Sequence, residues 1–391
     1  MLIKRLTLKK ILSFNEATVE LGSLNVLIGP NAVGKSNLIE VIGLLQAAPS
    51  SLATAILRGG GVRQLIWLGD PVPSPIATIR CQVELAQDQY PAAVDYRLRF
   101  SEDAAGFTIM GEQVAEADRS PAEDGVYIER SFTGVDFGRA AVRLLQPPPL
   151  GMKVPAGESI LSQFKNPADP TPITEIGRQF SRIRIFREFR TGPLSGARLG
   201  VSTSVSKEAL VDGGDNLALV LHELDFLGVH DKIRSYLQRF CDRFDDVRVN
   251  VGEGLSRTFL KEAGLAEMLS AIRMSDGTLK FLSLLAALFN PNPPPLICIE
   301  EPELGLHPDA LQLVAEALVE ASESTQLIVT THSEALVDAL TDQPECVLVC
   351  ERDFDNGTQM KRLSKVGLKD WLDRYSLGQL WRKGEIGGGR W

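Results

Sequence analysis

A glycine-rich segment at residues 29–36 constrains the fold of this chain more than any other feature. It reads Gly29-Pro30-Asn31-Ala32-Val33-Gly34-Lys35-Ser36 and fits the pattern G-x-x-x-x-G-K-[ST] at every fixed position. An apolar run at 24–28 precedes it and a helical pattern from Asn37 follows. Strand, glycine loop and helix in this order place backbone N–H groups where they bind phosphate. We therefore predict a nucleoside triphosphate site, with the Lys35 ammonium on the outer phosphates and the Ser36 hydroxyl on Mg²⁺.

A second segment, far downstream, ends in acidic residues. The apolar run at 295–299 is followed by Glu300-Glu301-Pro302-Glu303. This pattern indicates a buried parallel strand that delivers carboxylates to its carboxyl edge, where open α/β sheets bind ligands. Glu300 is the candidate Mg²⁺ ligand, and Glu301 is the candidate general base that orients the attacking water. An ordinary acidic loop has the same composition, but the glycine loop in the same chain favours the catalytic interpretation.

Two shorter elements fit the same kind of site. Ser275-Asp276-Gly277-Thr278 opens a periodic helix, so that the Ser275 hydroxyl and the Gly277 N–H lie at a helix N-terminus. Such a terminus can bind phosphate, although a plain N-cap explains Ser275 equally well. The apolar run at 326–331 ends in His332, which we expect to sense the γ-phosphate because its strand follows the acidic one in βαβ order.

These motifs resemble those of the ABC-type ATPases that work on DNA, the SMC, RecF and OLD groups. The chain most resembles the short RecF-like AAA family ATPases of bacteria, many of which lie in defence loci. The matching segments are GPNAVGKSN at 29–37, MSDGT at 274–278, ICIEEPELGLHP at 297–308 and LIVTTHSEAL at 327–336. The tail at 377–391 is also similar to that subgroup.

The resemblance implies a homodimer that traps ATP and Mg²⁺ between two protomers. The nucleotide contacts would extend from Gly29 to Asn37, and Ser275 and Gly277 would touch the γ-phosphate held by the opposite protomer's glycine loop. Residues 303–308 would form a D-loop that crosses the interface, and His332 would be the switch histidine. The usual signature has Gly where this chain has Asp276, a carboxylate close to a triphosphate. Lys280, one helical turn on, could offset that charge.

The family also uses a Q-loop glutamine that couples the nucleotide and its metal to a lid. Gln163 and Gln64 are both candidates, and we favour Gln163 because it lies where the β-rich part gives way to the middle insertion.

The motif positions and the patterns between them predict one large α/β fold with an antiparallel β-lobe and a helical insertion. The resemblance implies that the core is a P-loop NTPase core of the ABC type and that the insertion is a lid. Residues 1–160 would hold the first part of the core and the β-lobe, 161–268 a mainly helical lid, and 269–391 the rest of the core. Asp215 and Asn216 can cap a helix at 217–227, and a second helix is expected at 230–243. The insertion is too short, and lacks the heptads, for long coiled-coil arms.

Composition places the chain among cytoplasmic proteins. With 44% hydrophobic and 23% charged residues it is typical of a globular protein, and no apolar run is long enough to span a membrane. Its five cysteines are scattered without a C-x-x-C pair, which predicts a reducing compartment and neither a zinc site nor a disulfide. The net charge of −9 is unlike that of a protein that coats DNA, so that a DNA site would be a local patch.

Two further features have open interpretations. Arg178, Arg182, Arg184, Arg187 and Arg190 form a cluster that is either an ion-paired face or a strip that contacts phosphates or an acidic partner. The tail tryptophans Trp371, Trp381 and Trp391 either dock a partner or pack on the chain's own core.

Taken together, these features predict a Mg²⁺-dependent ATPase whose dimer opens and closes to act on or sense DNA, in repair or antiviral defence, with a separately encoded nuclease or effector. The alternative is a slow, nucleotide-gated scaffold that restrains an effector without binding DNA. An ABC transporter subunit is disfavoured by Glu300, since transporters normally carry Asp there, and by the Ser275–Thr278 signature.

Overall fold

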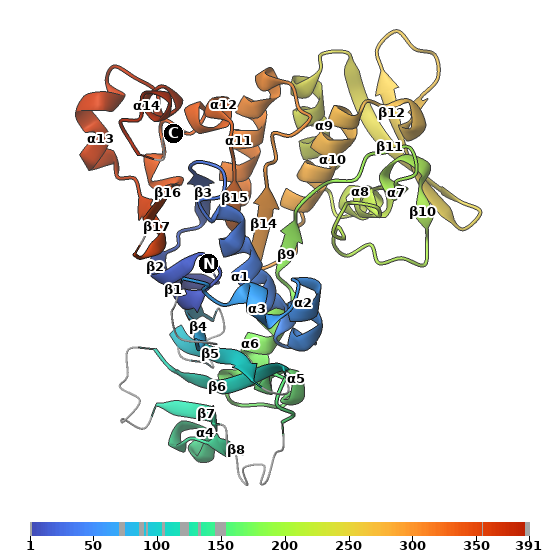
Figure 1. The fold of residues 1–391 in the computed structure, drawn as a ribbon. Helices are drawn as coiled ribbons and strands as arrows, with labels where there is room; N and C mark the ends of the chain where they lie inside the picture. The colour runs from blue at the N-terminus through green and yellow to red at the C-terminus, as the bar shows by residue number, and fades with distance from the viewer. Residues whose placement is uncertain are drawn as a thin grey trace. The chain divides into compact units, whose positions relative to one another are not determined.

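The computed structural model describes residues 2–69, 75–85, 90, 93–103, 106–117, 125–131, 134–144, 154–353 and 355–387. The chain divides into two compact units (Figure 1). The first unit comprises residues 1–183, 348–363 and 386–391, and the second comprises residues 184–347 and 364–385. Each unit mixes helices with strands, so the predicted α/β class is confirmed.

The first unit contains the glycine loop and the β-lobe. Its elements in chain order are β1 (Ile3–Ile11), β2 (Phe14–Glu20), β3 (Leu24–Ile28), α1 (Lys35–Ala47), α2 (Leu52–Arg58), α3 (Val62–Leu65), β4 (Ala77–Glu84), β5 (Ala93–Asp103), β6 (Gly106–Glu116), β7 (Val126–Ser131), β8 (Gly134–Phe137), α4 (Arg139–Leu144), α5 (Ile160–Gln163), α6 (Pro172–Ser181), β16 (Val347–Asp353) and β17 (Gly357–Arg362). The described strands follow the order β8-β7-β6-β5-β4-β1-β2-β17-β16-β3.

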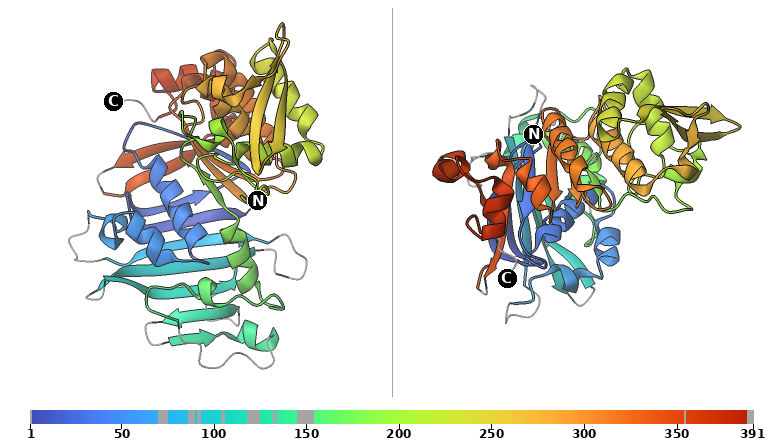
Figure 2. Two further views of the ribbon diagram at one scale, coloured as in Figure 1. Left: turned by 90° about the vertical axis from the view of Figure 1, so that its right-hand side faces the viewer. Right: turned by 90° about the horizontal axis from the view of Figure 1, so that it is seen from above.

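The β-lobe is antiparallel, as its alternating sequence predicts. Strands β4 to β8 pair in succession, and β4 continues onto β1. Helices α1 and α2 lie across one face of these strands in the left view of Figure 2. All five residues of β3 are buried, because this strand leads into the glycine loop through the core of the unit.

The second unit carries the acidic strand and the signature helix. Its elements are β9 (Arg184–Phe186), α7 (Gly196–Leu199), β10 (Val201–Ser202), α8 (Leu217–Phe226), α9 (His230–Phe240), β11 (Phe244–Gly252), β12 (Leu255–Glu262), β13 (Leu269–Ser270), the 3₁₀ helix η1 (Ala271–Arg273), α10 (Asp276–Leu288), β14 (Leu296–Glu300), η2 (Pro308–Ala310), α11 (Leu311–Ala321), β15 (Gln326–Thr330), α12 (Glu334–Asp338), η3 (Pro344–Cys346), α13 (Lys365–Leu372) and α14 (Leu377–Lys383).

Three parallel strands of this unit position the acidic residues. They run in the order β15-β14-β9, and Glu300 at the end of β14 aligns with Thr330 at the end of β15. Helix α10 is buried on almost all sides and stacks Phe281 on Phe240 of α9, with ring centroids 4.4 Å apart. The carboxyl ends of β9, β14 and β15 therefore meet at one edge, as the motif spacing predicts.

The middle of the chain is more mixed than a helical lid. Helices α8 and α9 form where their periodicity predicts them, but residues 161–268 also contain the antiparallel hairpin of β11 and β12. Asn216 occupies the N-cap position of α8 without capping it, because its amide oxygen accepts from Val211 N and its amide nitrogen donates to Ser206 O and Ala209 O. The side chain of Asn216 closes the preceding loop instead.

The tail tryptophans differ from one another. Trp381 of α14 is buried and Trp371 of α13 is partly exposed beside Tyr375. Trp391, with residues 388–390, lies outside the described residues. None of the helices in the described ranges has the length and apolar character needed to cross a bilayer.

Candidate ATP site

The glycine loop is shaped by close packing against the strands of its own unit. Gly29 and Gly34 both have positive φ, at 145° and 106°. A Cβ at Gly29 would collide with the Cys350 carbonyl, and one at Gly34 would collide with the hydroxyls of Thr358 and Ser13. Only glycine fits both positions, because the backbone of the loop approaches β16 and β17 too closely for a side chain.

Hydrogen bonds hold the rest of the loop. Thr358 Oγ1 donates to Val33 O over 2.6 Å, and Asn37 Nδ2 donates to Ser13 Oγ over 2.8 Å. Asn37 is predicted to contact the nucleotide, and in this structure its side-chain amide supports the loop. The loop geometry is fixed by the protein itself, so its N–H groups are in place before any phosphate arrives.

Lys35 is folded back into the loop. Its Nζ donates to the carbonyl oxygens of Gly29 and Pro30 over 2.8 and 2.9 Å, and its side chain is buried. Burial raises the pKa of the neighbouring Cys350 thiol to about 12, and the Lys35 charge opposes that rise only in part. A buried ammonium ringed by carbonyls, at a helix N-terminus, fits a triphosphate by charge and by shape.

The second unit gathers the acidic residues, the signature and the switch histidine. Glu301 has a φ of 47°, the left-handed region, and its N–H donates to Thr330 O over 2.9 Å. Its carboxylate Oε1 lies 3.8 Å from His332 Nε2. A glutamate held in this strained backbone region beside a histidine is the arrangement expected of a functional residue.

Glu300 is the more enclosed of the two acids. Its side chain is 15% exposed, and its Oε1 lies 3.0 Å from Arg187 Nη1. A cavity of about 210 Å³ is lined by Phe186, Arg187, Phe189, Lys280, Glu300 and Glu301, among others. The carboxylate of Glu300 in the second unit and the hydroxyl of Ser36 in the first unit are each hard oxygen donors of the kind that Mg²⁺ prefers.

Glu303, in the segment predicted to be a D-loop, contacts His332, the predicted switch histidine. Its Oε1 accepts from Thr331 Oγ1 over 2.7 Å and from the backbone N–H of His332 over 2.8 Å. Its Oε2 is buried, with no hydrogen-bond partner among the described residues. The sequence places Glu303 in the D-loop but does not predict this link.

Arg198, which no motif includes, holds the signature segment. Its Nη1 donates to the carbonyl oxygens of Ala271, Ile272 and Met274, over 3.1, 3.0 and 2.8 Å. Its Nη2 lies 2.6 Å from Asp276 Oδ1, and its side chain is 11% exposed. Lys280 does not meet Asp276 but donates to Leu304 O in the D-loop over 3.2 Å. Arg198, rather than Lys280 as predicted, therefore offsets the negative charge of Asp276.

The remaining predicted site residues have these surroundings. Ser275 caps α10 by accepting from Thr278 N over 3.1 Å, which is the N-cap interpretation, and its phosphate role stays a prediction. Gly277 lies next to the carbonyl oxygen of Gly305, which would be 3.0 Å from the Cβ of any larger residue at position 277. Gln163 donates to Glu158 Oε2 over 2.5 Å and to Ser162 over 3.2 Å, so its Q-loop role, like that of Gln64, also stays a prediction.

The arginine cluster is largely ion-paired. Arg178 pairs with Glu175 at 2.6 Å, Arg187 with Glu300, and Arg190 with Asp215 at 3.1 Å. These three arginines follow the ion-paired interpretation.

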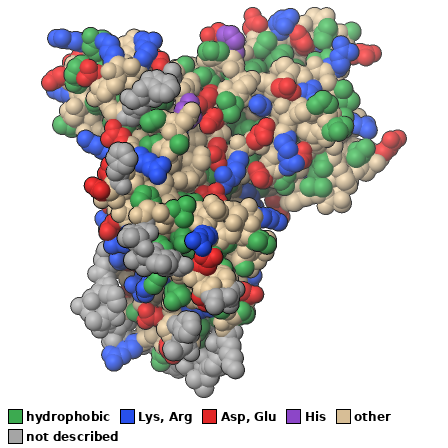
Figure 3. All heavy atoms as spheres, in the orientation of Figure 1, with side chains coloured by type: hydrophobic (Ala, Val, Ile, Leu, Met, Phe, Trp, Pro, Cys, Tyr) green, Lys and Arg blue, Asp and Glu red, His purple; other side chains and the backbone are tan. Residues whose placement is uncertain are grey.

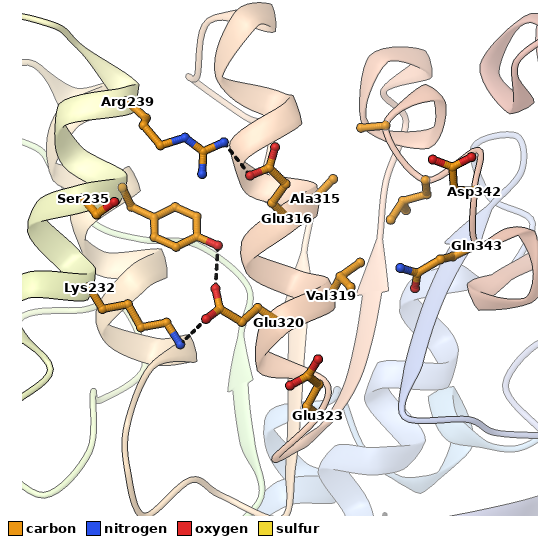
Figure 4. A pocket seen from close by; sticks show the side chains of 13 residues that line it. Lys232, Ser235, Arg239, Ala315, Glu316, Val319, Glu320, Glu323, Asp342 and Gln343 are labelled. Atoms are coloured by element: carbon orange, nitrogen blue, oxygen red, sulfur yellow. Dashed lines mark hydrogen bonds and ion pairs between the residues drawn. The ribbon is translucent and has the colours of Figure 1, made fainter.

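A larger cavity, of about 620 Å³, lies between α9, α11 and the segment after α12 (Figure 4). Four of its charged lining residues are paired, since Glu320 accepts from Lys232 at 2.6 Å and Glu316 accepts from Arg239. Glu320 also accepts from Tyr236 at 2.7 Å. Burial alone would raise the pKa of Glu320, but its hydrogen bonds with Lys232 and Tyr236 lower it. This cavity carries no nucleotide motif.

The fold is that of Smc head domains. The chain is similar to an Smc head bound to the C-winged helix domain of ScpA, at 15% identity and a TM-score of 0.60, covering 94% of this chain and 99% of that one. It is also similar to Smc heads derived from Pyrococcus furiosus (14% identity, TM-score 0.58, 95% and 98% covered) and Pyrococcus yayanosii (12%, 0.52, 95% and 99%). No curated protein matches by sequence. The chain therefore has the ABC-type P-loop ATPase fold of these heads.

A family model matches residues 24–111 and 194–338, more than half of the chain. The chain belongs to this family, whose description is "AAA domain, putative AbiEii toxin, Type IV TA system".

Proposed function

We propose that this protein is a Mg²⁺-dependent ATPase whose ATP-bound dimer closes and whose hydrolysis reopens it. The single observation that carries the proposal is Glu301, held at positive φ at the end of β14 with its carboxylate beside His332. Family membership supports ATP as the substrate.

Each residue has a distinct part in the proposed mechanism. Lys35 leaves the carbonyls of its own loop and binds the outer phosphates, while the loop N–H groups orient the triphosphate. Glu301 accepts a hydrogen bond from the attacking water and aligns it with the γ-phosphorus. His332 donates to the γ-phosphate and so reports its presence to Glu303 and the D-loop. Ser36 and Glu300 would hold Mg²⁺, which would supply positive charge to the phosphates.

The dimer is supported by apolar side chains on and beside the signature. Ile272 and Leu304 are exposed at 54% and 55%, and Leu194, a few residues from Arg198, is exposed at 89%. Large apolar residues that are exposed around a predicted contact surface favour a protein interface there. In the proposed dimer, Ser275 and Gly277 of this surface meet the nucleotide bound by the other protomer.

We further propose that the output is action on DNA or control of an effector protein, from the cytoplasm. The family description points to a toxin–antitoxin context, and two of the similar Smc heads are bound to domains of ScpA, which favours a protein partner. On the face drawn in Figure 3, the described Lys and Arg side chains are interspersed with Asp and Glu rather than gathered in one band. A DNA contact would therefore be a local patch, and the slow scaffold remains the alternative function.

Steady-state ATP hydrolysis tests this proposal. The purified protein is assayed with and without linear duplex DNA, at low and physiological salt, with covalently closed DNA as the control. Stimulation by free ends that weakens with salt supports a DNA-sensing ATPase. Slow turnover that DNA does not change supports the scaffold, and absence of turnover under all conditions contradicts the ATPase.

A further inference from the structure

Arg187 is placed next to Glu300 by the register of two parallel strands. Phe186, the last residue of β9, aligns with Ile299 of β14, so the residues that follow them, Arg187 and Glu300, lie at the same edge of the sheet. The two side chains meet there, with Arg187 Nη1 3.0 Å from Glu300 Oε1. Strand register therefore brings the backbones of the two residues close together.

The two members of the pair are unequally exposed. Glu300 is 15% exposed, whereas Arg187 is 49% exposed. A carboxylate so enclosed is costly unless a positive charge stays close to it. The guanidinium provides that charge from the solvent side, at the rim of the cavity that both residues line.

We propose that Arg187 is a positioning residue that holds and neutralises the Glu300 carboxylate until Mg²⁺ and ATP arrive. The inference rests on the proposed function, in which Glu300 is a Mg²⁺ ligand. While Arg187 neutralises Glu300, the carboxylate does not repel the incoming triphosphate. Once Mg²⁺ binds, it competes with Arg187 for the same carboxylate.

This competition has two measurable consequences. Without Arg187, ATP binding in the absence of Mg²⁺ weakens, because the Glu300 charge then faces the triphosphate. In the same variant, Mg²⁺ reaches half-saturation at a lower concentration, because no guanidinium competes for Glu300. A purely structural role for Arg187 would change affinity equally with and without Mg²⁺.

The experiment measures binding of a fluorescent ATP analogue in EDTA and across a Mg²⁺ titration. The variants are Arg187→Gln and Arg187→Met, which both remove the charge, and the matched control is Arg190→Gln, which breaks the Asp215 pair. We expect the ratio of Kd in EDTA to Kd in Mg²⁺ to rise about tenfold in both Arg187 variants, the size of one charge–charge interaction at a partly exposed site. The control should keep the wild-type ratio.

A double-mutant cycle with Glu300→Gln isolates the pair. In that background the carboxylate charge is gone, so Arg187→Gln should no longer change the ratio. An unchanged ratio in both single Arg187 variants, with normal melting temperatures, overturns the inference alone. If the wild-type protein binds no ATP in either condition, the proposed function is overturned and the inference with it.

Discussion

Arg198 Nη2 lies 2.6 Å from Asp276 Oδ1, at a position where the signature predicted from the family resemblance usually has glycine. The same guanidinium donates to three carbonyls of residues 271–274 and, through Nε, to Thr191 O over 2.9 Å. Asp276 is therefore a point of attachment for a buried arginine, and its charge is neutralised before any phosphate approaches. The departure from glycine is explained by this pair.

Replacing Arg198 with Lys should loosen the signature segment. A lysine cannot donate to the carbonyls and to Asp276 together, because it lacks the planar fork of arginine. We expect ATP affinity of the monomer to stay within about twofold, while ATP-dependent dimerisation weakens at least about tenfold, since charge-assisted hydrogen bonds contribute roughly 1.5–3 kcal/mol. Analytical ultracentrifugation with ATP measures this. Arg234→Lys, which affects an exposed arginine that donates to Asp245 O, is the matched control, and equal dimerisation of both variants would contradict the assignment.

Glu303 allows a comparison between two substitutions at one position. Glu303→Gln keeps an acceptor for Thr331 and His332 and replaces the buried Oε2, which has no hydrogen-bond partner in the part of the chain that the structure describes, with an amide nitrogen. Glu303→Ala removes the oxygen that accepts from the Thr331 hydroxyl and from the His332 N–H. Single-turnover kinetics should show a fall of about 10- to 100-fold in the hydrolysis rate for Ala but little change for Gln. Equal rates in the two variants would show that the D-loop is not coupled to His332 through this side chain.

Lys35→Ala should abolish nucleotide binding. The substitution removes the ammonium that the loop holds through Gly29 O and Pro30 O, and with it the main charge available to the outer phosphates. Isothermal titration with ATP and Mg²⁺ measures the loss, and a melting curve of the ligand-free variant verifies that it is folded. Retained ATP affinity would exclude the glycine loop as the binding site.

The buried Glu112 should make stability depend on pH. Burial raises the pKa of this carboxyl, although Ser159, the Ile160 N–H and Tyr96 all donate to it. The folded state therefore holds a proton that the unfolded state has already lost, so stability decreases as pH rises from the unfolded pKa through the higher folded pKa. Urea unfolding at pH 5 and pH 7.5 should show a larger decrease for wild type than for Glu112→Gln. The same decrease in both proteins would exclude Glu112 as its source.

Sequence alone predicts the parts of this molecule that depend on local patterns. The strand before Gly29, the helix after Lys35, the acidic strand at Glu300 and the helix capped by Ser275 all form as predicted, because each has a strong period and clear end signals. The hairpin of β11 and β12 also has a sequence signal, because Val247, Val249 and Val251 alternate with other residues before a turn at Glu253-Gly254. The prediction that 161–268 is mainly helical did not include this hairpin.

The interactions that shape the candidate site were not predictable in the same way. Arg187 meets Glu300 across 113 positions of sequence, and Arg198 meets Asp276 across 78. Nothing local distinguishes these arginines from others nearby, since their partners are chosen by strand register and by loop packing. A sequence pattern identifies which residues carry the chemistry, whereas the residues that orient them emerge only from the tertiary structure.

The most direct test of the proposed ATPase cycle is the mass of the Glu301→Gln variant in solution with ATP and Mg²⁺. Removing the base should leave nucleotide binding intact and stop hydrolysis, so the closed dimer accumulates. Light scattering should then report a dimer with ATP and a monomer without it. A variant that stays monomeric with ATP while hydrolysis continues would contradict both the role of Glu301 and the ATP-dependent dimer.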